Sequence, residues 1–457
     1  MNLYKYKNIY FVGIGGIGMS ALARYFNKRN LNILGYDKVR TPLCLDLESE
    51  NIHINYTDDI NLIPDDVKQN KEETLVVYTP AIPISNHQFS YFKDNGYKIL
   101  KRSELLGKIT QDNFTIAIAG THGKTTTSSI LAHILYNSNI DCTAFLGGIC
   151  SNYNSNLILG TKNSLVVVEA DEYDRSFLTL NPDIAVITSV APDHLDIYKN
   201  KENLKSAFTD FTNKIKSGGT LFLEDSVDTT MIDRNDISII KYSTSNITDI
   251  SSKNIVSRDE IMHFDVLFGE EIVTDFKLKM GGEYNVSNAL AAISISKKLN
   301  VSNENIVQSI NSFTGIERRF ETHLSNDDVI FIDDYAHHPE EIEKSILAVR
   351  DMYSDREITV IFQPHLYSRT NDFMDDFASS LSLSDKLILL EIYGAREQEI
   401  KGVSSDILLQ KCKVKNKKLS TKNEVLSLIK KNEVDVLLTL GAGDISTIVE
   451  PLKVKLS

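Results

Sequence analysis

The residues best suited to chemistry form a loop, Gly120-Thr121-His122-Gly123-Lys124-Thr125. It follows an apolar run over residues 114–119 and precedes an expected helix over residues 126–135. Backbone N–H groups of such a loop converge on phosphate, the helix N-terminus adds positive potential, and the lysine reaches the terminal phosphates. The loop is the shorter GxxGKT form, because Ile118 stands where the longer form has its first glycine. We therefore expect ATP to bind at Gly120–Thr126, with Thr126 included and the Thr125 hydroxyl on Mg²⁺.

A second glycine loop, Gly13-Ile14-Gly15-Gly16-Ile17-Gly18, lies between an expected first strand and first helix. Asp37 follows about 20 residues later, at the end of the next strand, which is the outline of a dinucleotide fingerprint. This pattern predicts diphosphate binding, with a tight strand-to-helix turn as the alternative. It leaves open whether the ligand is NAD or another diphosphate such as a nucleotide sugar.

Carboxylates follow the apolar run over residues 165–168, where Glu169, Asp171 and Glu172 lie close together. A second strand, expected over residues 184–189, leads into a loop that contains His194. The carboxyl ends of strands are where α/β enzymes place metal and substrate groups. Glu169 and His194 together could bind a divalent ion beside the phosphate loop, since carboxylate and neutral imidazole both ligate metals.

Two polar loops occupy the last third of the chain. One, residues 333–339, contains two acids, two histidines (His337 and His338) and a proline that can open a helix. The other, residues 362–370, contains Arg369, which suits a carboxylate or a phosphate but also an ordinary surface ion pair. Arg318 and Arg319 stand at an expected domain junction, either as a phosphate clamp or as a charged linker.

Alternating strand-like and helix-like segments must position these loops, which predicts an α/β protein with parallel sheets. The expected strands cover residues 8–12, 32–35, 75–78, 114–119, 165–169, 184–189, 329–333, 358–362, 386–391 and 434–440. Short alternating runs over residues 237–280 indicate added antiparallel strands. We expect three domains over residues 1–107, 108–317 and 318–457. The first and third are Rossmann-like, and the central one resembles P-loop ATPases.

Composition excludes several classes of function. The 457 residues carry a net charge of −13, which disfavours binding to nucleic acid or to an anionic membrane. No apolar stretch approaches the roughly 20 residues of a membrane span, and the first apolar run lacks a cleavage site. Four cysteines form no CxxC pair and no zinc pattern, which is typical of reduced, buried thiols. We therefore expect a cytoplasmic enzyme.

The chain resembles the Mur ligases of peptidoglycan synthesis over essentially its whole length. The motifs that carry the resemblance are FVGIGGIGMSALAR, GTHGKTTT, VEADEYDRSF, APDHLDIY, GEYNVSNALAA, GIERRF, DDYAHHPEEI, FQPHLYSRT and GAGDI. It implies one domain for a UDP-sugar, one for ATP and one for an incoming amino acid. FVGIGGIGMS with DDYAHHP favours the branch that joins L-alanine to UDP-N-acetylmuramate, or the related branch that joins a preformed tripeptide to the same sugar.

The resemblance also implies roles for individual residues. Gly15, Gly16, Ile17 and Gly18 would hold the UDP diphosphate, with Asp37 near the nucleoside. Lys124 would bind the β- and γ-phosphates, Thr125 and Glu169 one Mg²⁺, and His194 a second Mg²⁺. Asn285 would contact the adenine, Arg318 the phosphates, and His337 and Arg369 the reacting centre, with His337 as base. Asn55 and Tyr56 stand where a Gly-His pair is expected near the uridine.

The implied reaction is ligation through an acyl phosphate. ATP phosphorylates the carboxylate of UDP-N-acetylmuramate, and the amine of L-alanine then displaces phosphate. A monomer or weak homodimer is expected. Two other classes remain open on the residues alone: a nicotinamide-dependent oxidoreductase built on the first glycine loop, and a P-loop ATPase that drives motion or assembly.

Overall fold

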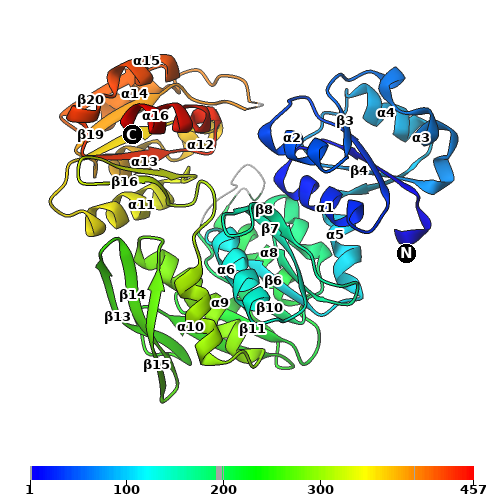
Figure 1. Ribbon diagram of the computed structural model, residues 1–457, viewed down its shortest axis with the longest axis horizontal. Helices are drawn as coiled ribbons and strands as arrows, with labels where there is room; N and C mark the ends of the chain where they lie inside the picture. The colour runs from blue at the N-terminus through cyan, green and yellow to red at the C-terminus, as the bar shows by residue number, and fades with distance from the viewer. Residues whose placement is uncertain (1–2, 192–197, 199, 396) are drawn as a thin grey trace. The chain divides into compact units, whose positions relative to one another are not determined.

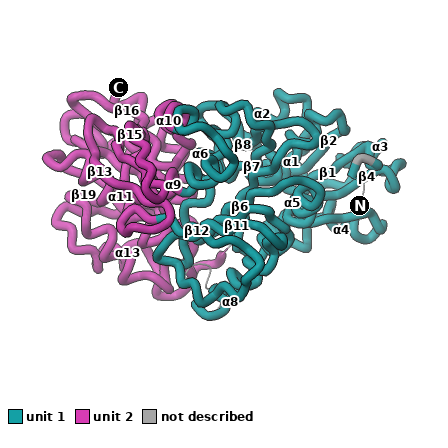
Figure 2. Tube along the Cα trace, turned by 90° about the horizontal axis from the view of Figure 1, so that it is seen from below, with its two compact units in different colours: residues 1–242, 291–306 teal, residues 243–290, 307–457 magenta. Residues whose placement is uncertain are grey.

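The computed structural model of the chain describes residues 3–191, 198, 200–395 and 397–457, and Figure 1 traces their helices and strands. The chain divides into two compact units, shown in Figure 2. The first unit comprises residues 1–242 and 291–306, and the second comprises residues 243–290 and 307–457.

The first unit begins with a parallel sheet of five strands in the order β3-β2-β1-β4-β5. Its strands are β1 (Asn8–Val12), β2 (Asn32–Tyr36), β3 (His53–Asn55), β4 (Thr74–Tyr78) and β5 (Lys98–Lys101). The central strand β1 is an unbroken buried run, as expected of a parallel sheet covered on both faces. The helices are α1 (Ile17–Asn27), α2 (Pro42–Ser49), α3 (Asp65–Gln69), α4 (His87–Asp94) and α5 (Arg102–Gln111).

A second sheet in the same unit runs in the order β12-β11-β10-β6-β9-β7-β8. All neighbours in it pair in parallel except β7 and β8. Its strands are β6 (Thr115–Ala119), β7 (Cys142–Cys150), β8 (Ser155–Ile158), β9 (Leu165–Glu169), β10 (Ile184–Ile187), β11 (Thr220–Glu224) and β12 (Ser238–Ser243). The helical segments among the described residues are α6 (Lys124–Asn137), α8 (Lys201–Thr212) and the 3-10 helices η4 (Tyr173–Thr179) and η5 (Thr229–Met231).

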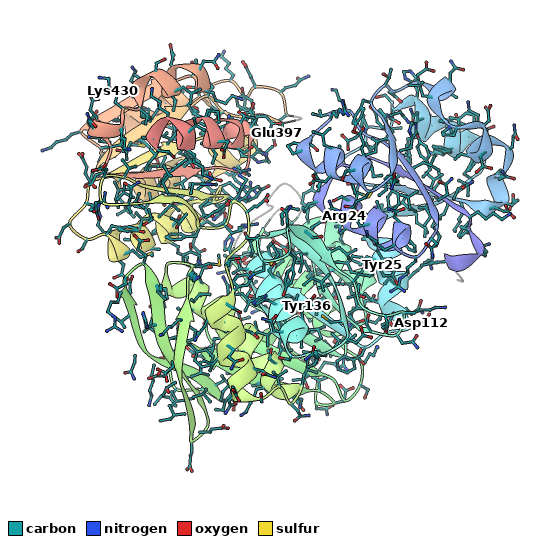
Figure 3. All side chains as sticks on the ribbon, viewed as in Figure 1. Arg24, Tyr25, Asp112, Tyr136, Glu397 and Lys430 are labelled. Atoms are coloured by element: carbon teal, nitrogen blue, oxygen red, sulfur yellow. The ribbon has the colours of Figure 1, made fainter. Side chains whose placement is uncertain are left out.

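Buried contacts connect helix α1 with strands β7 and β8 of the second sheet. Arg24 of α1, labelled with Tyr25 in Figure 3, is 5% exposed. Its guanidinium donates to Glu50 at 2.6 Å and to the Asn156 side chain of β8 at 2.5 Å. The Tyr25 ring packs against Phe145 of β7. Charge-assisted hydrogen bonds are directional, so they fix the orientation of α1 on β8 more narrowly than apolar packing alone would.

The second unit contains an antiparallel set, β13 (Ile250–Arg258), β14 (Ile261–Phe268) and β15 (Glu271–Leu278). It also contains a sheet of order β16-β17-β21-β18-β19-β20, parallel except between β16 and β17. The strands are β16 (Glu321–Ser325), β17 (Ile330–Asp334), β18 (Ile358–Phe362), β19 (Lys386–Leu390), β20 (Asn416–Ser420) and β21 (Val436–Leu440). The helices are α11 (Pro339–Met352), α12 (Tyr367–Asp372), α13 (Met374–Leu381), α14 (Ser405–Lys411), α15 (Lys422–Leu428) and α16 (Val449–Leu456). The chain passes between the units at the end of β12, within α9 (Glu283–Lys298) and within α10 (Asn303–Ser312).

The predicted α/β class is confirmed, with three mainly parallel sheets and an added antiparallel set. Two local expectations were wrong. The sequence of residues 101–107 predicts a closing helix and linker, but α5 continues to Gln111, with Gly107 inside it at a close contact. The first strand of the 237–280 region, β12, pairs in parallel with β11. All four cysteines are free and buried, and no helix among the described residues is long and apolar enough to cross a membrane.

Candidate active site

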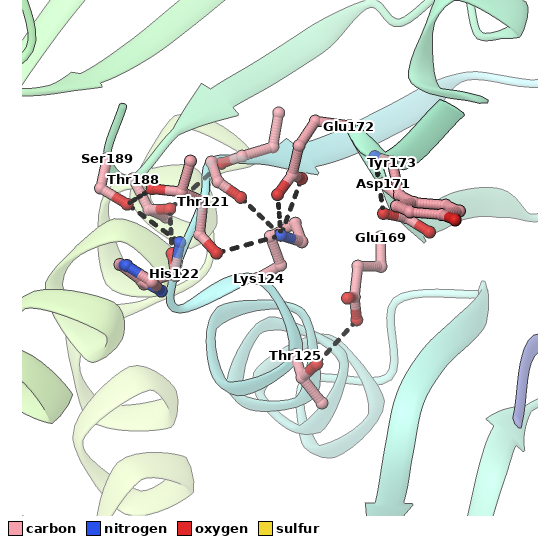
Figure 4. Close-up of polar contacts among 12 residues, drawn as sticks. Thr121, His122, Lys124, Thr125, Glu169, Asp171, Glu172, Tyr173, Thr188 and Ser189 are labelled. Atoms are coloured by element: carbon pink, nitrogen blue, oxygen red, sulfur yellow. Dashed lines mark hydrogen bonds and ion pairs between the residues drawn. The ribbon is translucent and has the colours of Figure 1, made fainter. Parts of the chain in front are cut away.

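Strand order brings the predicted phosphate loop and the predicted carboxylates to one edge of the second sheet. β6 lies between β9 and β10 and pairs in parallel with both. The loop after β6 therefore meets the carboxyl end of β9, where Glu169 stands, and the residues that follow β10. Figure 4 shows these side chains together.

Lys124, the first residue of α6, turns back over its own loop. Its ammonium group donates to the Gly120 carbonyl at 2.6 Å and to the Thr121 carbonyl at 3.3 Å. It also forms an ion pair with Glu172, at 2.8 Å to Oε2 and 3.0 Å to Oε1 (Figure 4). The lysine side chain is 12% exposed and that of Glu172 is fully buried.

Burial and charge act in opposite directions on this ion pair. Burial disfavours the charged ammonium of Lys124, but the carboxylates of Glu172, Glu169 and Asp171 outweigh it, so the pKa of Lys124 is raised. Burial raises the pKa of Glu172 to about 7, against the lowering effect of Lys124. The lysine is therefore a fixed positive charge, whereas the glutamate is a carboxylate that burial makes easy to protonate.

The Thr125 hydroxyl donates to Glu169 Oε2 at 2.9 Å, so these two predicted metal ligands do lie together. Gly147 of β7 makes room for them, because a Cβ there would lie 1.9 Å from Glu169 Oε2 and 2.8 Å from Thr125 Oγ1. The hydroxyl at the start of α6 and the carboxylate at the end of β9 form an oxygen ligand set that fits Mg²⁺. His194, predicted as a ligand of a second ion, lies outside the described residues.

Residues after β10 brace the phosphate loop. Thr121 Oγ1 lies 3.0 Å from Ser189 Oγ, and the His122 backbone N–H donates to the same Ser189 oxygen at 3.0 Å. The Thr121 N–H donates to the Ser189 carbonyl at 3.1 Å. The loop is therefore already shaped by the sheet, which lowers the cost of ordering it around a ligand.

The other glycine loop follows β1 and opens α1, as predicted. Asp37, just after β2, accepts a hydrogen bond from the Gly15 N–H at 2.8 Å, so this acid does meet the loop. Gly16 and Ile17 are exposed. Asn55, at the end of β3, is 9% exposed; it donates to Tyr10 at 2.7 Å and accepts from Gln88 at 2.9 Å. That side chain is therefore part of a buried network.

In the second unit, Arg318 lies at the carboxyl ends of β17 and β21. Its guanidinium donates to Asp333 Oδ2 at 3.2 Å and to the Gly441 carbonyl at 2.5 Å. It also lies over the Tyr335 ring, 5.3 Å from the centroid. Asn285, near the start of α9, is buried and donates to the Gly281 carbonyl at 2.8 Å.

His337 lies in the loop after β17, and Arg369 lies in α12, which follows β18. His337 Nδ1 is 3.0 Å from the Tyr335 carbonyl and 3.2 Å from Glu341, which favours the tautomer with its proton on Nδ1. Burial, together with the charges of His337 and Arg369, lowers the pKa of His365 to about 4. Its ring stacks on Tyr393, with centroids 5.8 Å apart.

Three features of these sites were missed from the sequence. Glu172 stood in a recognised acidic motif without an assigned partner, and His365 stood in the Arg369 loop without a role. Gly147 had a detectable signal, a Gly-Gly pair inside an apolar run, which marks close approach within a strand. The contact it permits depends on β7 pairing with β9, which the local pattern does not reveal.

Family models match three stretches of the chain. Residues 8–113 match the "Mur ligase family, catalytic domain", residues 118–296 the "Mur ligase middle domain" and residues 318–443 the "Mur ligase, glutamate ligase domain". A UDP-N-acetylmuramate–L-alanine ligase of Porphyromonas gingivalis is 46% identical over 449 residues, 98% of either chain. One of Flavobacterium psychrophilum is 46% identical over 456 residues, 100% of this chain and 99% of the relative.

Solved structures agree with these matches. A UDP-N-acetylmuramate–alanine ligase from Thermotoga maritima has a TM-score of 0.82 and 26% identity, covering 97% of each chain. A murein peptide ligase from Psychrobacter arcticus shares the fold, with a TM-score of 0.72 and 23% identity over 98% of each chain. On the strength of the full-length identity, the chain belongs to the Mur ligase family.

Proposed function

We propose that the chain joins L-alanine to the carboxylate of UDP-N-acetylmuramate, with cleavage of ATP to ADP and phosphate, in peptidoglycan synthesis. The observation that carries this function is the 46% identity with alanine-adding relatives over 98% of the chain. The motifs FVGIGGIGMS and DDYAHHP leave the tripeptide-joining branch open as the alternative, and the likeness to a murein peptide ligase structure, at 23% identity, supports the fold alone. An oxidoreductase would leave the Lys124 loop without a role, and a motor ATPase would leave the first glycine loop without one.

The ATP site comprises Gly120–Thr126, with Lys124 on the β- and γ-phosphates, Asn285 on the adenine and Arg318 on the phosphates. Thr125 and Glu169 hold one Mg²⁺, and His194 helps to hold a second. Bound there, Mg²⁺ neutralises phosphate charge. The fit of the described residues supports this site, because Thr125 and Glu169 already share a 2.9 Å hydrogen bond and Lys124 remains charged.

The UDP-sugar site comprises Gly15, Gly16, Ile17 and Gly18 around the diphosphate, with Asp37 toward the nucleoside. The contact of Asp37 with the Gly15 N–H supports this grouping. We place the UDP-sugar domain at residues 1–107, the ATP domain at 108–317 and the amino-acid domain at 318–457. The protein acts in the cytoplasm, where ATP and UDP-sugars are made, as a monomer or weak homodimer.

The reaction takes two steps. A carboxylate oxygen of the muramoyl group attacks the γ-phosphorus of ATP, the bond to the β-phosphate oxygen breaks, and ADP leaves. The amine nitrogen of L-alanine then attacks the acyl carbon, and phosphate leaves from the tetrahedral intermediate. Lys124 stabilises the phosphate charge in the first step, and Arg369 binds the carboxylate of alanine.

A base must take a proton from the ammonium group of alanine before the nitrogen can attack. We assign this role to His337. Its Nδ1 faces the Tyr335 carbonyl and Glu341, which leaves Nε2 free of a proton to accept one.

The function is tested by phosphate release with ATP, Mg²⁺ and UDP-N-acetylmuramate, with L-alanine or the tripeptide as acceptor. We expect release that requires both UDP-N-acetylmuramate and L-alanine. Release only with the tripeptide would move the chain to the tripeptide branch, and release that is indifferent to the acceptor would contradict a ligase.

A further inference from the structure

Gly18, the last glycine of the first loop, touches a side chain from a distant helix. A Cβ on Gly18 would lie 3.0 Å from Nη1 and 3.1 Å from Cδ of Arg102. Arg102 is the first residue of α5 and lies 84 positions further along the chain. The absence of a side chain at position 18 therefore admits the guanidinium group to the first turn of α1.

This turn is where an anion would bind. The first N–H groups of a helix have no partner within the helix and carry its positive dipole end. The Gly15 N–H is already occupied by the Asp37 carboxylate at 2.8 Å, and that carboxylate repels an anion on its side. A diphosphate is therefore favoured toward the Gly18 side of the loop, which Arg102 faces.

Most N–H donors of the Arg102 guanidinium are not used in hydrogen bonds among the described residues. Within the described part of the chain, the guanidinium has one hydrogen-bonding partner, Asp171, at 3.5 Å, a distance at the outer limit of such a bond. A guanidinium offers five N–H donors and suits two phosphate oxygens at once. The Arg102 side chain is 22% exposed, so it is accessible yet partly shielded from water.

Asp171 stands in the segment that links β9 to η4, between Glu169 and Glu172. In Figure 4 it lies apart from the contact between Lys124 and Glu172. It is further fixed by the Tyr173 N–H, which donates to Asp171 Oδ1 at 3.1 Å. Asp171 therefore holds Arg102 loosely over the glycine loop and keeps it oriented.

We propose that Arg102 is a diphosphate-binding residue of the sugar-nucleotide site, oriented by Asp171. This assignment rests on the proposed function, because it takes the first glycine loop as the place of the UDP diphosphate. Arg102 binds the phosphate oxygens through charge-assisted hydrogen bonds and takes no part in the ATP site.

The test uses the full chain and UDP as the calorimetric probe. Arg102→Met keeps the length of the side chain and removes its charge, and Arg102→Lys keeps the charge without the fork. Losing charge-assisted bonds worth about 1.5–3 kcal/mol weakens binding roughly 10- to 100-fold, so we expect that loss in R102M and a smaller one in R102K. The KM for the UDP-sugar should rise in step, while the affinity for ATP stays unchanged.

Lys101→Met is the matched control. Lys101, the last residue of β5, is the neighbouring cation and pairs with Asp174 of η4 at 3.3 Å, so it connects the start of α5 with η4. We expect K101M to bind UDP as the wild type does. UDP affinity in R102M within threefold of wild type, or an equal loss in K101M, would overturn the role of Arg102 while leaving the ligase function intact. A wild-type chain that binds no UDP would overturn both.

Discussion

Lys124 and Glu172 form a buried ion pair that competes with the binding of phosphate by Lys124. The ammonium group lies against two carbonyls of its own loop and against a fully buried carboxylate. When Lys124 moves to the phosphates, Glu172 loses its cation in a buried place. A carboxylate in that position takes up a proton more readily, so ATP binding should be linked to proton uptake at Glu172.

The pH dependence of ATP affinity tests this linkage. Burial raises the pKa of Glu172 to about 7 against the lowering effect of Lys124, so movement of the lysine to the phosphates should raise this pKa further. The complex therefore holds more protons than the free protein, and affinity should fall as pH rises above 7, by up to about tenfold per pH unit. Binding of a non-hydrolysable ATP analogue with Mg²⁺, measured at about pH 6.5 and pH 8, reports the slope.

Glu172→Gln supplies the comparison. The amide still accepts a hydrogen bond from Lys124 but does not titrate, so the slope due to Glu172 should disappear. Affinity at the higher pH should also increase in this variant. Titration of the nucleotide itself is the same in both proteins and cancels. Identical pH slopes in wild type and E172Q would show that the protonation of Glu172 does not change when ATP binds.

Single residues also mark the limit of prediction from sequence. The phosphate loop and Glu169 could be found because glycine, lysine and carboxylate positions follow apolar runs at recognisable spacing. The role of Glu172 could not, because it depends on Lys124 folding back over its loop instead of extending. Asn55 illustrates the same limit, since its partners Tyr10 and Gln88 lie far from it in the sequence.

At the scale of elements, α5 connects the glycine loop of the first sheet with the segment that follows β9. Its Gly107 lies against η4: a Cβ there would be 2.6 Å from the Thr179 carbonyl oxygen. Thr179 Oγ1 in turn donates to the Ser103 carbonyl of α5 at 3.0 Å. This close packing positions Arg102 at one end of the helix.

Gly107→Ala should therefore destabilise the protein although alanine is the better helix former. Alanine gains about 1 kcal/mol over glycine in helix propensity. Pressing its methyl group against the Thr179 carbonyl costs about 1–3 kcal/mol. We expect thermal unfolding to shift down by a few degrees and the KM for the UDP-sugar to rise. Lys108→Ala, at a half-buried position one residue on, serves as the control and should change neither. An unfolding midpoint in G107A equal to or above that of wild type would show that α5 does not depend on this contact.

Elements were predictable where a strand is a buried apolar run that ends in polar residues. The bounds expected for β1, β9 and β18 agree with the structure at both ends. The end of α5 was missed because glycine commonly stops a helix, and only tertiary packing shows that this one serves close approach. The pairing direction of β12 was wrong because alternation predicts a half-buried strand without giving the direction of its partner.

At the scale of the whole molecule, the candidate groups for one reaction are distributed over two compact units. The phosphate loop, Glu169 and the first glycine loop belong to one, whereas Arg318, His337 and Arg369 belong to the other. The three domains expected over residues 1–107, 108–317 and 318–457 stay a prediction, whereas the two glycine loops could be recognised because each directly follows a strand, β1 or β6. The precise contacts of substrates depend on side chains from several elements, which local patterns do not bring together.

The central claim is that these groups activate a carboxylate of the sugar nucleotide with ATP. It is tested most directly with UDP-N-acetylmuramate labelled with ¹⁸O in its carboxylate, incubated with ATP, Mg²⁺ and L-alanine. The bridging oxygen of an acyl phosphate comes from the carboxylate and leaves with the phosphate when the amine attacks the acyl carbon. The account therefore predicts one ¹⁸O atom in each inorganic phosphate released. Inorganic phosphate without ¹⁸O would mean that ATP is cleaved by water and would contradict the account.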